Sequence, residues 1–262
     1  MEIKFHKYQG TGNDFVLLDN RDNRYDFFTK EQVAFLCNRH FGIGADGLIL
    51  LNKKEGFDFE MKYFNADGAE GSMCGNGARC IIKFAYNSGI KKNTYRFTAC
   101  DGEHEAEIDI NALVRLKMND VDKVETYLNH FVVNTGSPHF IKYSGDVTNM
   151  DVKASGKSIR YSKEFAEKGI NVNFIETVDD DKIYVRTYER GVEDETLSCG
   201  TGVTASALVA AHNENGFNHV KVKTQGGNLS VEFDKKDDNH FENIWLIGPA
   251  TFVFKGEIII EN

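Results

Sequence analysis

The sequence predicts an α+β fold built from two duplicated domains of similar structure. Alternation of apolar and polar residues, which is typical of half-buried strands, is frequent along the chain. Helical signals are fewer and are separated by these strand patterns. Three motifs also recur in the same order at nearly one spacing, which indicates an internal duplication.

The clearest strands are predicted at 57–63, 220–222 and 229–233, where apolar side chains occupy every second position. A helix is predicted over 30–39, because Thr29 and Gln32 have the spacing of a capping box. Two further helices are predicted at 75–87 and 200–212, each directly after a cysteine in a C-G-x-G motif.

Three pairs of similar motifs give the residue spacing between the two copies. Cys74 and Cys199 are separated by 199 − 74 = 125 residues. The stretches "GNDFVLLD" and "GSPHFIKY" begin 136 − 12 = 124 residues apart, and "DGEHEAEID" and "GGNLSVEFD" end 234 − 109 = 125 residues apart. Repeats in a common order predict two domains of about 120 residues each.

The 262-residue chain is long enough for two such cores. We predict a first domain at 1–120, completed by about 250–262, and a second at 121–249. The joint is expected in the polar stretch 119–130, which interrupts the strand pattern.

Composition narrows the class of protein. With 31 basic and 40 acidic residues the net charge is −9, which argues against nucleic acid or an anionic membrane as a partner. The first residues have no apolar signal-peptide core, and no apolar stretch has the length of a membrane span, so a cytoplasmic protein is expected. The five cysteines form no C-x-x-C, which favours reduced thiols over a disulfide framework or a zinc site.

Each C-G-x-G motif places a thiol at the start of a helix. Unpaired N–H groups and the positive end of the helix dipole bind anions there, and they also raise the thiolate fraction of a cysteine. Two such sites facing one cleft suit inversion of an acidified carbon, because one thiol removes a proton and the other returns a proton to the opposite face.

Less specific interpretations apply to single residues. Cys37, Cys80 and Cys100 are expected to be small packing residues. A disulfide between Cys74 and Cys199 is the redox alternative to acid–base chemistry.

Several polar residues also allow two interpretations. His139 is either an acid–base neighbour of a thiol or a structural residue before a strand. Glu189 and Arg190 are either a solvated charge pair or substrate-recognition groups. Asn13, Asn65 and Asn171 are either turn residues or ligands of a substrate.

Taken together, "GTGNDFVLLD", "FNADGAEGSMCGNGARC", "GSPHF", "GINVNF" and "YERGVEDETLSCGTG" resemble the successive motifs of the diaminopimelate epimerase family, over nearly the whole chain from Gly10 to the stretch 248–254. The resemblance implies a mostly antiparallel sheet wrapped on a central helix in each domain, with the active site in the cleft between them. It implies interconversion of LL- and meso-diaminopimelate without pyridoxal phosphate or metal, in lysine and peptidoglycan precursor synthesis. A homodimer and a small-molecule substrate are also implied.

The resemblance assigns roles by position. Cys74 and Cys199 correspond to the two acid–base thiols, and His139 and Glu189 to the groups that assist them. The residues that correspond to substrate-binding positions are Asn13, Asn65, Gly75, Asn76, Asn171, Glu189, Arg190, Gly200 and Thr201. Arg190 suits a distal carboxylate, because a guanidinium donates two parallel hydrogen bonds.

This chain departs from the family pattern at four places. Ser137 replaces a frequent Asn, and Gly47 stands where some members have a substrate-facing Gln. The segment around Glu193 and Asp194 is one residue longer than is common, and Phe254 replaces a Tyr of the dimer interface.

Two other functions share some of these features. A racemase of proline or hydroxyproline uses the same thiol pair but has no need of Arg190 and three asparagines for a second charged end. A thiol redox or binding protein would use the same clefts, with a reversible disulfide as part of its function.

Overall fold

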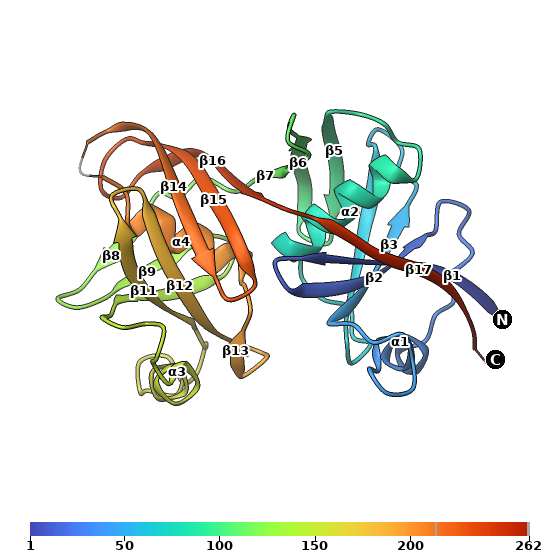
Figure 1. The fold of residues 1–262 in the computed structure, drawn as a ribbon, viewed down its shortest axis with the longest axis horizontal. Coiled ribbons are helices and arrows are strands. Elements are labelled where there is room, and N and C mark those ends of the chain that lie inside the picture. Colours follow the sequence, from blue (N-terminus) through green and yellow to red (C-terminus); the bar gives the residue numbers. More distant parts are fainter. Residues whose placement is uncertain (213, 261–262) are drawn as a thin grey trace. The chain divides into compact units, whose positions relative to one another are not determined.

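The computed structural model describes residues 1–212 and 214–260, and their contacts divide the chain into two compact units. The first unit is Met1–Leu116 together with the C-terminal segment from Gly248, and the second unit is Lys117–Ile247. The chain therefore passes to the second unit shortly before the stretch 119–130, and it returns for its last strand (Figure 1).

The first unit is a sheet around one helix. Its elements are β1 (Glu2–Gly10), β2 (Asn13–Asp19), α1 (Lys30–Cys37), β3 (Gly47–Asn52), β4 (Phe59–Asn65), α2 (Gly75–Asn87), β5 (Thr94–Ala99), β6 (Gly102–Ile108), β7 (Val114–Lys117) and β17 (Thr251–Ile259). The strands pair in the order β17-β1-β2-β3-β4-β5-β6-β7. Only β2 with β3 and β4 with β5 are parallel.

The second unit repeats this arrangement. Its elements are β8 (Val124–Thr126), β9 (Phe131–Asn134), β10 (Pro138–Tyr143), α3 (Val152–Arg160), β11 (Asn171–Asp179), β12 (Lys182–Glu189), β13 (Asp194–Thr196), α4 (Gly200–Val209), β14 (Gly216–Thr224), β15 (Gly227–Lys235) and β16 (Phe241–Gly248). The order is β8-β9-β10-β11-β12-β14-β15-β16, and again only the third and fifth pairings are parallel. The predicted α+β duplication with a mostly antiparallel sheet is confirmed.

A helix lies at the centre of each sheet. In the first unit α2 contacts β1, β2, β3, β4, β6 and β17, and in the second unit α4 contacts β9, β10, β11, β12, β14 and β15. Ten of the thirteen residues of α2 are buried, and so are eight of the ten residues of α4. A helix that is buried on nearly all sides needs apolar or small residues around its circumference, which explains the Gly- and Ala-rich sequence after each cysteine.

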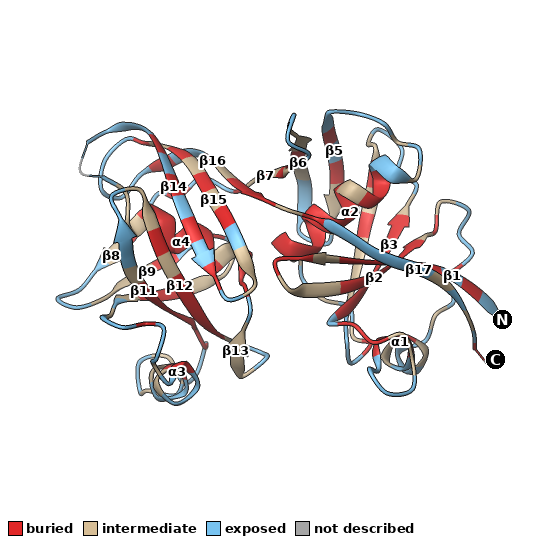
Figure 2. Cartoon of the chain, viewed as in Figure 1, coloured by how far each residue is buried: buried red, intermediate tan, exposed pale blue. Residues whose placement is uncertain are grey.

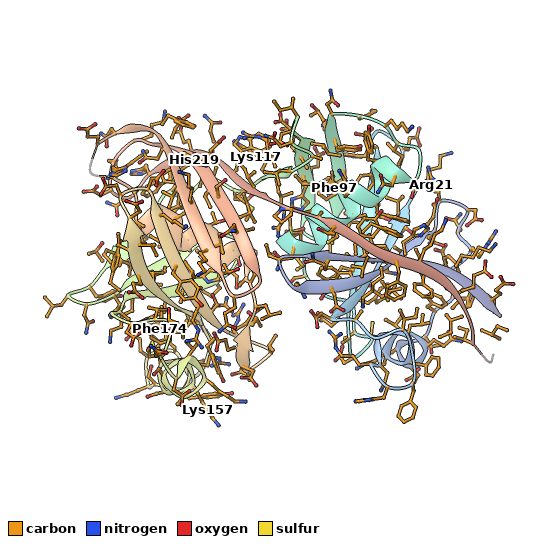
Figure 3. The ribbon with its side chains drawn as sticks, viewed as in Figure 1. Arg21, Phe97, Lys117, Lys157, Phe174 and His219 are labelled. Carbon is orange, nitrogen blue, oxygen red and sulfur yellow. The ribbon has the colours of Figure 1, made fainter. Side chains whose placement is uncertain are left out.

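The strands predicted at 220–222 and 229–233 are confirmed within β14 and β15, and the strand predicted at 57–63 begins two residues later, at Phe59 of β4. Along β14 and β15 the buried residues recur at every second position, as the burial colours of Figure 2 show. In the first unit Phe59 and Phe97 stack with ring centroids 5.1 Å apart, and in the second unit Phe174 belongs to the buried cluster under α3; Phe97 and Phe174 are labelled in Figure 3.

The predicted helices exist, with two corrections to their ends. The capping box of Thr29 and Gln32 is present, but α1 ends at Cys37 because Asn38 has an extended backbone. The helix after Cys199 ends at Val209, three residues before the predicted end.

One helix had no sequence prediction. In α3 Val152 and Gly156 are buried and Ile159 packs against the same cluster, so the apolar side of this helix has only two large apolar residues. A Cβ on Gly156 would lie 2.3 Å from Cβ of Tyr188, which shows how closely this helix packs on β12. None of the helices in the described residues combines the length and apolar character of a membrane span.

Candidate active site

Cys74 and Cys199 occupy the same position in the two units. Cys74 is the N-cap of α2, with φ −117° and ψ 119°, and Cys199 is the N-cap of α4, with φ −114° and ψ 114°. The two carbonyls accept the first helical hydrogen bonds, from Ala78 and Val203, both at 2.8 Å. Since the first N–H groups of a helix lack acceptors within it, each thiol stands beside an anion-binding helix terminus.

An asparagine of β2 is a polar neighbour of Cys74. Sγ of Cys74 lies 3.7 Å from Oδ1 of Asn13, and Nδ2 of Asn76 donates to the same oxygen at 3.3 Å. Nδ2 of Asn13 donates to Asp46 at 2.6 Å, which fixes the orientation of the amide. The structure thus brings together the predicted residues Cys74, Asn13, Gly75 and Asn76.

A fully buried arginine supports this group. The guanidinium of Arg79 donates to Oδ1 of Asn76 at 2.9 Å and to Oγ1 of Thr11 at 3.1 Å, and both acceptors are neutral. Burial lowers the pKa of Arg79, but arginine stays protonated in proteins. Sequence analysis missed this residue, although an arginine between the small residues of the first turn and the apolar residues that follow was a visible signal.

The charges next to Asn13 compensate each other. Asp14 forms ion pairs with Lys7 at 2.7 Å and with Arg39 at 2.7 Å, and Arg39 also pairs with Asp46 at 2.7 Å. Desolvation opposes ionisation of Asp14, but hydrogen bonds from Arg39 and Lys7 outweigh it and lower its pKa to about 2. Because this cluster has two anions and two cations, it leaves little net charge beside Cys74, whereas the guanidinium of Arg79 forms no ion pair with a carboxylate of the described residues.

A hydroxyl lies next to Cys199, and an imidazole lies next to that hydroxyl. Sγ of Cys199 lies 3.5 Å from Oγ1 of Thr201, and Nε2 of His139 lies 2.9 Å from the same oxygen. His139 is fully buried within β10, and burial, followed by the charge of Arg190, lowers its pKa to about 3. The imidazole is therefore neutral at physiological pH, and the structure links it to Cys199 through Thr201.

The second glycine of the C-G-x-G motif in the second unit has a steric role. A Cβ on Gly202 would lie 2.4 Å from Oδ1 of Asn173 and 3.2 Å from Cε1 of His139. Only glycine allows α4 to approach these two side chains so closely. In the first unit, a Cβ on Gly77 would meet the flexible ends of Ile49 at 3.0 Å and Met61 at 3.3 Å.

A second polar group of the second unit contains Asn171 and Arg190. Nδ2 of Asn171 donates to Oγ of Ser137 at 2.9 Å, and its Oδ1 accepts the backbone N–H of Arg190 at 2.8 Å. The Arg190 guanidinium donates to the carbonyl of Lys168 at 3.0 Å and to Oγ of Ser137 at 3.4 Å. Ser137, the replacement noted in the sequence, therefore ties two predicted substrate-binding residues together.

Glu189 and Asn65 are each the last residue of a strand. Glu189 ends β12 and its carboxylate accepts a hydrogen bond from Thr196 at 3.0 Å. Asn65 is an exposed residue at the end of β4 in the first unit. At Gly47, a Cβ would lie 2.5 Å from Cε2 of Tyr63, so this ring leaves no room for a longer side chain such as Gln.

The remaining cysteines divide into two kinds. Cys37 and Cys80 are buried, as predicted for packing residues, and desolvation raises the pKa of both, that of Cys37 to about 12. The packing prediction for Cys100 is wrong, because this residue is exposed in the turn after β5.

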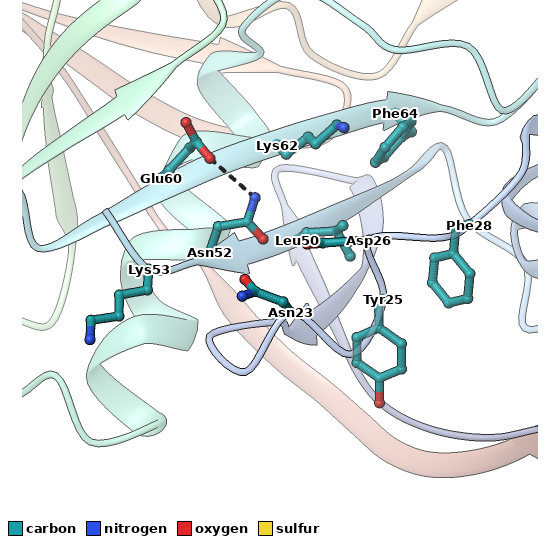
Figure 4. A pocket seen from close by; sticks show the side chains of 10 residues that line it. All are labelled: Asn23, Tyr25, Asp26, Phe28, Leu50, Asn52, Lys53, Glu60, Lys62 and Phe64. Carbon is teal, nitrogen blue, oxygen red and sulfur yellow. Dashed lines mark hydrogen bonds between the residues drawn. The ribbon is translucent and has the colours of Figure 1, made fainter. Parts of the chain in front are cut away.

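An open cleft of about 410 Å³ lies on the first unit, between the loop after β2 and strands β3 and β4 (Figure 4). Its lining residues include Asp26, Asn52, Glu60 and Lys62, and the figure shows the 3.3 Å hydrogen bond from Asn52 to Glu60. None of the predicted site residues lines it. Within the described residues, no three His, Cys, Asp or Glu side chains are grouped as metal ligands.

In sequence, the chain is similar to proteins named diaminopimelate epimerase. A family model for diaminopimelate epimerase matches residues 5–124 and 131–253. A diaminopimelate epimerase of Flavobacterium psychrophilum is 46% identical over 260 residues, which cover 98% of this chain and 100% of the relative. One of Chlorobaculum tepidum is 44% identical over 262 residues, with 96% and 99% covered.

Solved structures share the fold. A phenazine biosynthesis protein of the PhzF family from Bacillus anthracis superposes with a TM-score of 0.79 at 16% identity, over 99% of this chain and 100% of that chain. A probable proline racemase from Agrobacterium radiobacter superposes with a TM-score of 0.69 at 14% identity, over 99% and 93%. At such low identity the likeness shows the duplicated α+β fold alone.

Proposed function

The chain belongs to the diaminopimelate epimerase family, and we propose that it interconverts LL- and meso-diaminopimelate by proton transfer at one α-carbon. In this proposal Cys74 and Cys199 are the two acid–base groups, and the product serves lysine and peptidoglycan precursor synthesis. The observation that carries the mechanism is the identical placement of both thiols, each at the N-cap of a buried central helix.

The proton transfer requires no reagent other than the two thiols and the substrate. A thiolate takes the α-proton and becomes a thiol, and the pair of electrons from the C–H bond remains on the carbon beside the carboxylate. The other thiol gives its proton to the opposite face and becomes a thiolate. Reaction of the other stereoisomer exchanges the two roles, so the chemistry needs neither pyridoxal phosphate nor a metal.

The helix termini stabilise the intermediate. We assign the N–H groups of Gly75 and Asn76 and those of Gly200 and Thr201 to the reacting carboxylate, where negative charge increases as the proton leaves. Asn13 lies beside Cys74 and holds the same end of the substrate. His139 and Glu189 assist the thiols, and His139 does so through Thr201.

The distal end of diaminopimelate carries a second amino group and carboxylate. We assign Arg190 to the distal carboxylate, and Asn65, Asn171 and the carboxylate of Glu189 to the rest of this end. Ser137 already accepts hydrogen bonds from Asn171 and Arg190, and it orients both side chains toward one ligand. A racemase of proline would have no use for this second group of polar residues.

We propose that the protein is a homodimer in a reducing compartment, the cytoplasm. Strand β17, exposed along most of its length in Figure 2, presents Phe252, Val253 and Phe254 with 44%, 50% and 44% of their surfaces exposed. An apolar strand of this kind suits a second copy of the chain.

Sedimentation at micromolar concentration should give a dimer, and Phe254→Lys should give a monomer. A monomeric wild type would contradict this proposal.

The test of the activity is incubation of reduced protein with LL-diaminopimelate in D2O. We expect meso product with deuterium at the α-carbon, measured by NMR. Cys74→Ser and Cys199→Ser should each lower the rate by about 10²- to 10⁴-fold, the usual contribution of an acid–base group. Cys100→Ser, which changes an exposed cysteine outside the site, is the matched control.

Three results would contradict the proposal. Protein that is reduced and metal-free but gives no exchange would exclude it, and so would faster racemisation of proline than of diaminopimelate. Activity that requires a reversible disulfide would favour the thiol redox alternative, because oxidation only inactivates a two-thiol epimerase.

A further inference from the structure

The buried amide of Asn173 determines which nitrogen of His139 carries the proton. Asn173 lies on β11 with none of its surface exposed, and its Nδ2 lies 3.1 Å from the carbonyl oxygen of Phe140. A carbonyl can only accept, so this contact fixes Nδ2 on that side of the amide. On the other side, Oδ1 accepts the hydroxyl hydrogen of Thr187 at 2.9 Å.

Because the orientation of the Asn173 amide is fixed, the His139 imidazole can adopt only one tautomer. Nδ2 of Asn173 also lies 3.1 Å from Nδ1 of His139, and an amide nitrogen can only donate there. Nδ1 must therefore accept, and the neutral ring carries its proton on Nε2. An imidazolium would place an N–H against the N–H of the amide, which agrees with the direction of the pKa of His139 below its usual value.

The proton on Nε2 then sets the direction of the next hydrogen bond. Nε2–H donates to Oγ1 of Thr201 at 2.9 Å, so the hydroxyl hydrogen of Thr201 is left to donate elsewhere. Sγ of Cys199 lies 3.5 Å from this oxygen, within the range of a hydrogen bond to sulfur. Each hydrogen bond is thus donated in the same direction. Asn173 donates to His139, His139 donates to Thr201, and Thr201 donates to the sulfur.

We propose that Asn173 is a positioning residue that holds His139 as the neutral Nε2–H tautomer, so that the Thr201 hydroxyl donates its hydrogen to the thiolate of Cys199. The inference rests on the proposed function in taking Cys199 as a reacting thiol. His139 then exchanges no proton with substrate; it makes the Thr201 hydroxyl a stronger donor, since hydrogen bonds in a buried series polarise one another.

The corresponding positions of the first unit carry different side chains. The position that corresponds to Thr201 is Asn76, at 201 − 76 = 125 residues, and its amide donates to Asn13. The position that corresponds to His139 is Phe15, at the 139 − 15 = 124 residues that separate "GNDFVLLD" from "GSPHFIKY", and its buried side chain has no hydrogen-bonding group. The two thiols therefore have different hydrogen-bonding partners although their backbones match.

The tautomer is tested directly by ¹⁵N NMR of histidine-labelled protein. We expect His139 to show a protonated Nε2 and an unprotonated Nδ1 from neutral pH to below pH 5. In Asn173→Asp a carboxylate replaces the amide and can only accept, so Nδ1 should become protonated. Asn218→Asp, at another buried asparagine of the second unit, should leave the His139 signals unchanged.

The hydrogen bond to sulfur is tested by alkylation with iodoacetamide at pH 7, with each cysteine followed by peptide mass spectrometry. Thr201→Val should slow alkylation of Cys199 by about tenfold, the usual effect of losing a hydrogen bond to a charged group. Thr201→Ser should restore the wild-type rate, and Cys74 in the same molecules is the internal control.

Each outcome decides the proposal. It is overturned if wild-type His139 carries a proton on Nδ1, if Asn173→Asp keeps the Nε2–H tautomer, or if Thr201→Val reacts at the wild-type rate. Where Asn173→Asp does not fold, the wild-type spectrum and the Thr201 variants still decide it. None of these measurements uses turnover, so a failure of the proposed epimerase activity would be seen separately.

Discussion

In the first unit, Nη2 of Arg79 donates a hydrogen bond to Oδ1 of Asn76 at 2.9 Å, inside the helix that begins after Cys74. This contact places a buried cation within the same helix as the thiol. A buried positive charge without a carboxylate partner stabilises a nearby thiolate, because little water is present to screen it.

We therefore expect Arg79→Met to slow alkylation of Cys74 by iodoacetamide at pH 7 by about tenfold, the effect of removing one nearby opposite charge. Cys199 should react at its wild-type rate in the same protein. Arg96→Met, at an arginine whose side chain is 65% exposed on β5, is the matched control. Unchanged reactivity of Cys74 in a folded Arg79→Met protein would show that the charge does not act on the thiol.

The glycines of the two C-G-x-G motifs should differ in their tolerance of a methyl group. Gly202→Ala places a Cβ 2.4 Å from Oδ1 of Asn173, whose orientation is fixed, and we expect a loss of about 1–3 kcal/mol in the free energy of unfolding. Gly77→Ala should cost less, because the ends of Ile49 and Met61 can move. Urea titrations measure both, and Trp245, the single tryptophan of the chain, reports on the second unit. Equal costs would contradict this steric explanation.

The buried His139 makes stability depend on pH. Its pKa is about 3 in the folded protein and 6.5 in the unfolded chain, so the unfolded state binds the proton first. The contribution of His139 is complete above pH 6.5 and is lost as the pH falls from 6.5 toward 3. The slope reaches about 1.4 kcal/mol per pH unit for one proton. His139→Gln should remove this part of the slope in urea titrations between pH 7 and pH 5, and parallel curves for the two proteins would refute the assignment.

The ion pair of Arg186 and Glu195 should stabilise the strand before Cys199. Nε and Nη2 of Arg186 donate to the two carboxylate oxygens at 2.6 and 2.7 Å, and both side chains are largely buried. Glu195→Ala leaves a buried guanidinium without its anion, and we expect a loss of about 3–5 kcal/mol in the free energy of unfolding. The exposed pair of Asp181 and Lys221 is the control, and Asp181→Ala should cost less than about 1 kcal/mol. Similar losses for the two variants would contradict a special role of the buried pair.

The duplication could be predicted because it depends on local sequence patterns. Strand alternation depends only on which face of the sheet is buried, and the C-G-x-G helix starts depend on the chemistry of one turn. The offset of 125 residues between Cys74 and Cys199 reappears between the first residues of α2 and α4, and between those of β6 and β15. Helix α3 was not predicted, because its buried side, formed by Val152, Gly156 and Ile159, has only two large apolar side chains; Gly156 also packs closely on Tyr188.

The sequence by itself determined the α+β duplication, the family and the two candidate thiols, because each of these depends on residues that are near one another in the chain or repeated along it. Only the tertiary structure decided what surrounds each thiol. Asn173 and Arg79 could not be identified as partners of His139 and Asn76 before their side chains were placed, because a hydrogen bond depends on direction as well as on distance. The same placement showed that Cys100 is exposed and that two helix starts of nearly identical sequence have different chemical neighbours.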